Sequence, residues 1–161
     1  MKRRIIGLDP GLASTGWGIV DYEKSRIAYL AHGCIETEAA LPRAERLFII
    51  YREINNVLDT YTPTEAAMET LYFGRNVSSA IAVAEARGVL SLSLAERNLP
   101  LLECTPNQIK QAVVGVKKAE KEQVQEMVAL ILGLPVIPRP DHAADALGAA
   151  ICAAHGLTPS I

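Results

Sequence analysis

The sequence lacks the long apolar segment that a membrane span requires, since no uninterrupted apolar run approaches roughly 20 residues. It also lacks the pattern of a secretory signal. The basic start, residues 1–4, is followed by only residues 5–8 before Asp9, which is too short for the hydrophobic region of a signal peptide. We therefore expect a cytoplasmic protein.

Cysteine is scarce. Cys34, Cys104 and Cys152 are odd in number and far apart, so they make neither a disulfide framework nor a CxxC zinc site. All three lie in apolar segments. We expect buried thiols in a reducing compartment.

The chain has no excess of positive charge. Its formal net charge is −2 and its pI is about 5.9, which argues against a nucleic-acid-binding protein. However, binding needs a local basic patch rather than a basic total. Two bound divalent cations would also reverse the sign of the net charge. Composition therefore leaves nucleic-acid binding open.

The sequence contains no phosphate-binding loop of the common nucleotide-binding types. Gly115 lacks a following Gly-Lys-Ser/Thr at the required spacing, and Gly16-x-Gly18 lacks the third glycine. A length of 161 residues predicts one domain, residues 1–161, large enough to bury a core. This is too short for the two-domain ATPases of the actin and sugar-kinase type, which also open with a strand and an Asp-Gly turn.

What is present is a series of apolar segments with the spacing of strands and helices. Short links between the first three expected strands favour an antiparallel meander. The later alternation of strands and helices favours an α/β fold, a mixed sheet with helices on both faces. The expected strands are 3–9, 16–21, 26–37, 64–69 and 100–104, and the expected helices are 42–61, 76–97, 106–114, 119–132 and 141–155.

The expected helix 76–97 carries small residues at every fourth position, Ala80, Ala84 and Gly88. A glycine inside a helix costs roughly 1 kcal/mol relative to alanine, so close approach of another backbone is a plausible compensation. That backbone belongs either to the sheet or to a second subunit. The spacing does not choose between them.

Acidic residues end two of the expected strands. Asp9 follows an apolar strand and Glu69 ends the fourth strand, so both carboxylates emerge at one sheet edge if these strands are neighbours. An isolated charge near the core is costly, and a metal ion is one candidate partner. Taken singly, Asp9 is more often a turn former and Glu69 a solvated strand end.

A second acidic cluster opens the last expected helix. His142 and Asp145 are three residues apart and Asp141 and Asp145 are four apart, so spacing alone cannot choose between the pairs. If Asp141 is the N-cap, His142 and Asp145 become the metal-facing pair. Singly such pairs are usually surface pairs, but together with Asp9 and Glu69 they indicate a metal site. Carboxylates with one imidazole suit magnesium or manganese.

Such a cluster can hold two metal ions ~3.5–4 Å apart, which activate a water and stabilise the leaving oxygen in phosphodiester hydrolysis. A lysine run is usually a solvated surface, but here it precedes the acidic helix, and phosphate contact is an equal alternative. An aromatic pair after Glu69 lies in an expected loop and can stack on unpaired bases. The candidate DNA-binding residues are Tyr72, Phe73, Arg75, Lys110, Lys117, Lys118 and Lys121.

Four motifs occur in order along the chain: residues 7–11 with 15–16, residues 69–73 with 86–88, residues 113–115 with 119–121, and residues 141–146. Together they resemble the RuvC family of bacterial Holliday-junction resolvases over essentially the whole chain. The resemblance implies a ribonuclease-H-like fold with a five-stranded mixed sheet. It also implies a homodimer that binds four-way DNA junctions and makes paired symmetric nicks in recombination and DNA repair.

The resemblance further implies two Mg²⁺ ions per site, with Mn²⁺ as a substitute, and work beside the RuvA–RuvB branch-migration complex. By position, Asp9, Glu69 and Asp145 match acidic metal ligands, and His142 falls where some members carry an aspartate. The helix 76–97 resembles the dimerisation helix.

Three further positions match family residues that meet DNA. Tyr72 matches an aromatic that stacks near the junction centre. Lys110 and Lys121 match basic residues implicated in DNA contact and catalysis.

Two alternatives stay open. One is another nuclease of the same fold that acts on RNA or RNA–DNA hybrids. The other is a junction-binding scaffold with a degenerate site, against which the complete set of four candidate ligands argues.

Overall fold

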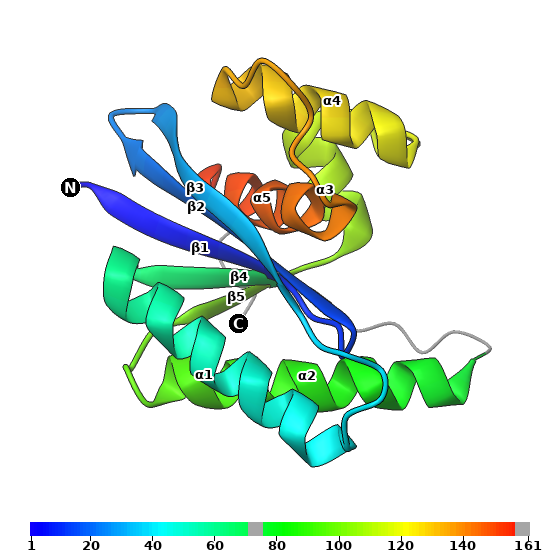
Figure 1. Cartoon of the computed structure of the whole chain (residues 1–161). Coiled ribbons are helices and arrows are strands. Elements are labelled where there is room, and N and C mark those ends of the chain that lie inside the picture. The colour runs from blue at the N-terminus through cyan, green and yellow to red at the C-terminus, as the bar shows by residue number, and fades with distance from the viewer. Residues whose placement is uncertain (71–75, 157–161) are drawn as a thin grey trace.

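The computed structural model describes residues 1–70 and 76–156, which form a five-stranded sheet with helices on both faces (Figure 1). Every expected element is present, with its ends moved by no more than two residues. The strands are β1 (Arg3–Asp9), β2 (Ser14–Glu23), β3 (Arg26–Glu36), β4 (Glu65–Glu69) and β5 (Leu101–Cys104). The helices are α1 (Arg43–Tyr61), α2 (Val77–Ala95), α3 (Pro106–Val113), α4 (Lys121–Leu132) and α5 (Asp141–Ala154).

The sheet is mixed and has the strand order β3-β2-β1-β4-β5. The first three strands form the antiparallel meander expected from their short links, while β1 pairs with β4 and β4 with β5 in parallel. Because β1 and β4 are parallel neighbours, their carboxyl ends reach the same edge of the sheet. The expectation that Asp9 and Glu69 emerge together is thereby confirmed.

Two apolar layers enclose the sheet, with α3, α4 and α5 on one face and α1 and α2 on the other (Figure 1). Successive strand side chains point to opposite faces. In β1, accordingly, Ile5 joins the cluster beneath α5 and Ile6 joins the cluster beneath α1 and α2.

Helix α5 lies unusually close to β1. Its side chains are mostly alanine, and a Cβ atom built on Gly7 would lie 1.8 Å from the carbonyl oxygen of Ala146. No other residue than glycine leaves room for this contact, so the sequence of β1 determines how deeply α5 sits on the sheet.

Gly88 of α2 does not pack on the sheet. A Cβ atom there would meet nothing within 4 Å, and the core contacts of α2 come from other residues, among them Ala86 and Leu90. Sheet packing is therefore the wrong explanation for Gly88, and a subunit contact stays a prediction. By length and composition alone α2 could also cross a membrane, a test that helices of protein cores pass as well.

Two smaller expectations concern Pro42 and the thiols. The expected helix 42–61 begins one residue later, and Pro42 occupies the N-cap position of α1. Cys104 and Cys152 are buried and free, as expected, whereas Cys34 is free but partly exposed. Its Sγ lies 2.9 Å from Oγ of Ser14.

Candidate active site

Four candidate ligands converge where β1 and β4 end and α5 begins. Strand alternation places Asp9 and Glu69 on the α5 side of the sheet, because Ile5 and Ala67 of the same two strands belong to the cluster beneath α5. His142, in the first turn of α5, contacts Asp9 directly, with Nδ1 2.7 Å from Oδ2.

Gly16 makes the contact between His142 and Asp9 sterically feasible. It pairs with Asp9 in the β1–β2 ladder, and a Cβ atom on it would lie 2.0 Å from the carbonyl oxygen of His142. The first turn of α5 therefore rests on the bare backbone of β2. Any side chain at position 16 would push that turn, and the imidazole with it, away from Asp9.

Asp145 lies one helical turn further along α5 and is paired with a lysine. Nζ of Lys121, the first residue of α4, is 3.1 Å from Oδ2 of Asp145 and 4.0 Å from Oδ2 of Asp141. Glu69, Lys110, Lys121 and Asp145 all line one cavity of about 260 Å³. The structure thus brings Glu69, Asp145 and two of the four predicted lysines to a single pocket.

The carboxylates of this pocket are held close together at an electrostatic cost. Burial raises the pKa of Glu69, and the charges of Asp9 and Asp145 raise it further. Although part of the Glu69 side chain is exposed, it forms part of the concave pocket wall, where its charged form is less well solvated. Burial also raises the pKa of Asp145, although the hydrogen bond from Lys121 opposes this shift.

The pKa values of the two cationic partners are raised as well, which for a base favours the charged form. The hydrogen bond to Asp9 raises the pKa of His142, and the charges of Asp9 and Asp145 contribute to the rise. Burial alone would lower the pKa of Lys121, but Asp145, Asp141 and Asp9 together raise it. The carboxylates of the cluster therefore stabilise the protonated forms of both His142 and Lys121.

This donor set fits divalent cations. Three carboxylates and one imidazole are ligands that Mg²⁺ and Mn²⁺ accept, and the raised pKa values of Glu69 and Asp145 mean that a cation here would relieve repulsion. Within residues 1–70 and 76–156, no three acidic, histidine or cysteine side chains lie close enough to share one ion as they stand. Binding of one ion by three of these side chains would therefore require them to turn toward it.

Other predicted residues fall elsewhere. Asp141 is not the N-cap of α5: Pro140 holds that position, and Asp141 is the first helical residue, paired with Arg139. Lys117 lines a different cavity, beside His155, and Lys118 is exposed. The remaining predicted residues, Tyr72, Phe73 and Arg75, lie outside the described residues.

Two residues near the site were not among the sequence-based candidates. Nη1 of Arg87, in α2, donates a hydrogen bond of 2.6 Å to the backbone carbonyl of Glu69. Gln125, one turn after Lys121 on α4, is 4% exposed and helps to lower the pKa of Asp145, although no acceptor meets hydrogen-bond geometry at its Nε2 within the described ranges. The sequence offers only the spacing of Gln125, four residues after Lys121, as a signal for it, because its burial is visible only in the structure.

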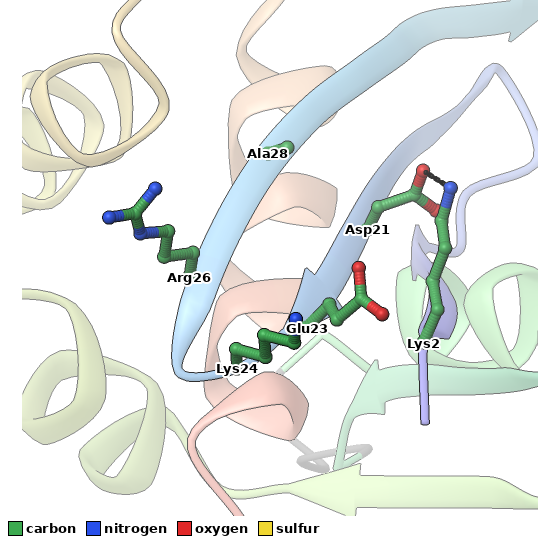
Figure 2. A pocket seen from close by; sticks show the side chains of 6 residues that line it. All are labelled: Lys2, Asp21, Glu23, Lys24, Arg26 and Ala28. Carbon is green, nitrogen blue, oxygen red and sulfur yellow. Dashed lines mark ion pairs between the residues drawn. The ribbon is translucent and has the colours of Figure 1, made fainter.

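A second cavity, of about 590 Å³, lies at the opposite end of the strands (Figure 2). Lys2, Asp21 and Lys24 are among the residues that line it, and Nζ of Lys2 lies 2.8 Å from Oδ2 of Asp21. Arg4 also pairs with Asp21, at 2.7 Å. Because Arg4 pairs with Asp21 in the ladder whose other end joins Asp9 to Gly16, this cavity takes no part in the acidic site.

Comparisons with known proteins point to one family. Residues 5–153 match the family described as Crossover junction endodeoxyribonuclease RuvC. The protein of that name from Treponema denticola is 52% identical over 91% of this chain and 83% of its own length, and the one from Heliobacterium modesticaldum is 47% identical over 96% and 95%. The structure of T. thermophilus RuvC in complex with Holliday junction substrate is similar, with a TM-score of 0.88, 34% identity and coverage of 93% of this chain and 92% of that one.

Proposed function

The chain belongs to the RuvC family of crossover junction endodeoxyribonucleases, and we propose from this and from its acidic site that it resolves four-way DNA junctions by paired, symmetric phosphodiester hydrolysis. The observation that carries the proposal is the convergence of Glu69 and Asp145 with Lys110 and Lys121 in one pocket, beside the Asp9–His142 pair. Members of the RuvC family are divalent-metal-dependent nucleases.

The finer cofactor assignment is part of the proposal. Asp9, Glu69, His142 and Asp145 hold two Mg²⁺ ions, for which Mn²⁺ can substitute. When bound, the ions supply an activated water and stabilise the leaving oxygen. The carboxylates of Asp9 and Glu69 lie at the ends of β1 and β4, and that of Asp145 lies on α5. The packing of α5 on the sheet therefore sets their relative positions.

Lys121 and Lys110 supply the positive charge that a phosphodiester needs. Nζ of Lys121 lies 3.1 Å from Oδ2 of Asp145. A short movement of this ammonium would transfer it from that carboxylate to a phosphate oxygen in the pocket. Lys110 lines the same pocket, and its charge opposes the rise in the pKa of Glu69, which favours the ionised carboxylate that a cation requires.

Membership of the RuvC family also supports a proposal for the subunits and partners with which the protein acts. We include in the proposal that residues 1–161 act as one nuclease domain in the cytoplasm, as a homodimer, beside the RuvA–RuvB complex. The exposed apolar side chains of Val77, Ile81 and Leu92 on α2 support a subunit contact on that helix.

The substrate is tested by incubating the protein with a synthetic mobile four-way junction, a linear duplex of the same sequence and an RNA–DNA hybrid, each with Mg²⁺ or Mn²⁺. We expect symmetric paired nicks in the junction alone. Cleavage of the hybrid with an intact junction would instead identify a ribonuclease of the same fold.

The site is tested with the variants Asp9→Asn, Glu69→Gln and Asp145→Asn. Each removes a charged ligand while preserving side-chain size, so we expect cleavage to fall by a factor of roughly 10² or more while junction binding persists. If a variant loses both junction binding and a cooperative unfolding transition, it is misfolded. Its loss of cleavage then does not support a role for that residue as a metal ligand.

A further inference from the structure

Arg87 joins three elements of the fold at the end of β4. From α2, its guanidinium donates through Nη1 to the backbone carbonyl of Glu69, at 2.6 Å, and its Nη2 forms an ion pair with Glu103 of β5. Its side chain is 13% exposed, whereas that of Glu103 is 54% exposed. The planar guanidinium presents both donors in a fixed geometry, which a lysine cannot reproduce.

Glu69 is a residue whose backbone needs such support. The β1–β4 ladder ends at the pair Leu8–Met68, so Glu69 lies beyond it and pairs with β5 alone, opposite Cys104. Thr70 no longer belongs to the strand, which ends at Glu69. A strand end held on one side only is free to twist, and a twist at residue 69 moves its carboxylate.

The hydrogen bond and the carboxylate lie on opposite faces of the sheet. Met68 and Leu101 pack with α1 and α2, whereas Ala67 and Cys104 pack beneath α5. Alternation therefore places Glu103 on the α2 side, where Arg87 meets it, and the Glu69 carboxylate on the α5 side. Arg87 thus binds the backbone of Glu69 from the α2 face of the sheet, opposite to the face on which the pocket lies.

The support is mechanical rather than electrostatic. The strongest influences on the pKa of Glu69 are burial and the charges of Asp9, Asp145, Lys110 and Lys121. The charge of Arg87 is offset by its ion pair with Glu103. The rigid base for the contact is α2 itself, whose neighbouring residues Ala86 and Leu90 are fully buried.

We propose that Arg87 is a positioning residue, which fixes the last peptide of β4 between α2 and β5 and thereby aims the Glu69 carboxylate at the cation site. The proposal rests on the proposed function, since it requires Glu69 to be a metal ligand. Residues that orient metal ligands typically contribute a factor of about 10 to 100 in metal affinity or activity.

The test compares Arg87→Met, Arg87→Lys and Glu103→Gln with Leu90→Ala, a matched variant that destabilises the same helix without touching Glu69. Mn²⁺ binding is measured without DNA, by the electron paramagnetic resonance signal of the free ion. Cleavage of the four-way junction is then measured as a function of Mn²⁺ concentration. Thermal unfolding is followed for every variant.

For Arg87→Met we expect Mn²⁺ affinity to fall about 10-fold or more, and the Mn²⁺ concentration for half-maximal cleavage to rise by a similar factor. Arg87→Lys should give an intermediate change, because a single ammonium nitrogen replaces the two guanidinium nitrogens that reach Glu69 and Glu103. Glu103→Gln, which keeps an acceptor for Arg87, should change less than Arg87→Met. Leu90→Ala should lower thermal stability and leave Mn²⁺ affinity at the wild-type value.

Equal Mn²⁺ affinity in Arg87→Met, Arg87→Lys and the wild type would overturn the proposal, as would a loss in Leu90→Ala as large as in Arg87→Met. If Arg87→Met does not fold, the comparison of Arg87→Lys with Leu90→Ala decides the same question. A wild-type protein that does not cleave the junction would overturn the proposed function instead, so the two failures are distinguishable.

Discussion

Nδ1 of His142 and Oδ2 of Asp9 lie 2.7 Å apart, although the two residues come from opposite ends of the chain. One belongs to the first turn of α5 and the other to the last position of β1. The contact ties the protonation of an imidazole to the charge of a candidate metal ligand. It therefore predicts how the protein should respond to pH.

Metal affinity should fall in mildly acidic solution. In the protein without metal, the hydrogen bond to Asp9 raises the pKa of His142 above its ordinary 6.5, Asp9 and Asp145 add to the rise, and Lys121 opposes it. Since a protonated imidazole cannot ligate a cation, protons compete with the metal at a higher pH than for free histidine. We expect Mn²⁺ affinity and cleavage to decline as pH falls through a midpoint above 6.5.

The substitution His142→Asp supplies the control for this pH dependence. A carboxylate ionises near pH 4 in ordinary surroundings, so the midpoint should move to lower pH. If the acid limb of the wild type persists unchanged in His142→Asp, His142 is not the group that causes it.

Lys121→Ala should slow cleavage by roughly 10²-fold, because it removes the ammonium 3.1 Å from Asp145. Lys121 also lowers the pKa of Asp145, so its loss raises that pKa further and weakens metal binding at neutral pH. Single-turnover cleavage with saturating enzyme measures this effect separately from DNA binding.

Lys117→Ala is the matched comparison for Lys121→Ala. Lys117 is exposed and lines another cavity, so at most it should reduce the salt dependence of junction binding and leave the single-turnover rate near the wild-type value. Equal effects of the two variants on the rate would show that Lys121 has no special place in the site.

Gly16→Ala should impair the site through packing alone. The added Cβ would lie 2.0 Å from the carbonyl oxygen of His142, so the first turn of α5 must move away from β2. We expect weaker Mn²⁺ binding and a lower melting temperature. Gly148→Ala adds the same methyl group to α5 at an ordinary 3.4 Å from Ile109, and its melting temperature should stay close to that of the wild type.

Asp21→Asn should destabilise the protein at neutral pH without affecting the acidic site. Hydrogen bonds from Arg4 and Lys2 lower the pKa of Asp21 in the folded state. Its contribution to stability is therefore present above the unfolded-state pKa near 4 and is lost as pH falls through the lower folded-state value. We expect a loss of about 1–3 kcal/mol at pH 7 and a much smaller difference at pH 2.

Urea unfolding of wild type and Asp21→Asn at the two pH values measures this stability difference. A difference that is equal at both pH values would exclude the ionised Asp21 as its source. Cleavage at low temperature should be unchanged, because Asp21 lies at the other end of β2 from the site.

Much of the site followed from sequence because strand ends are easy to locate. Asp9 and Glu69 close apolar strands, and parallel pairing of β1 and β4 brings them to one edge. The choice between Asp141 and His142 required coordinates, because it depends on a one-residue difference in where α5 starts, and sequence patterns do not resolve helix ends that finely. With Pro140 at the N-cap, Asp141 turns to Arg139 and His142 to Asp9.

Arg87 could not have been assigned from the sequence for a different reason. Its acceptor at Glu69 is a backbone carbonyl, which every residue possesses and which leaves no pattern in the amino-acid order. Packing of α2 on the sheet decides which carbonyl the guanidinium meets. Contacts of this kind become visible only when the helix and the strand end are placed together.

The docking of α5 has a consequence for the cell that makes this enzyme. Asp9 and Glu69 lie in strands β1 and β4, whereas His142 and Asp145 lie in α5, which follows all five strands of the sheet in the chain. A nascent or prematurely terminated chain that stops before residue 141 therefore lacks two of the four proposed ligands. If these four residues are the ligands, cleavage requires α5 to be docked on the completed sheet.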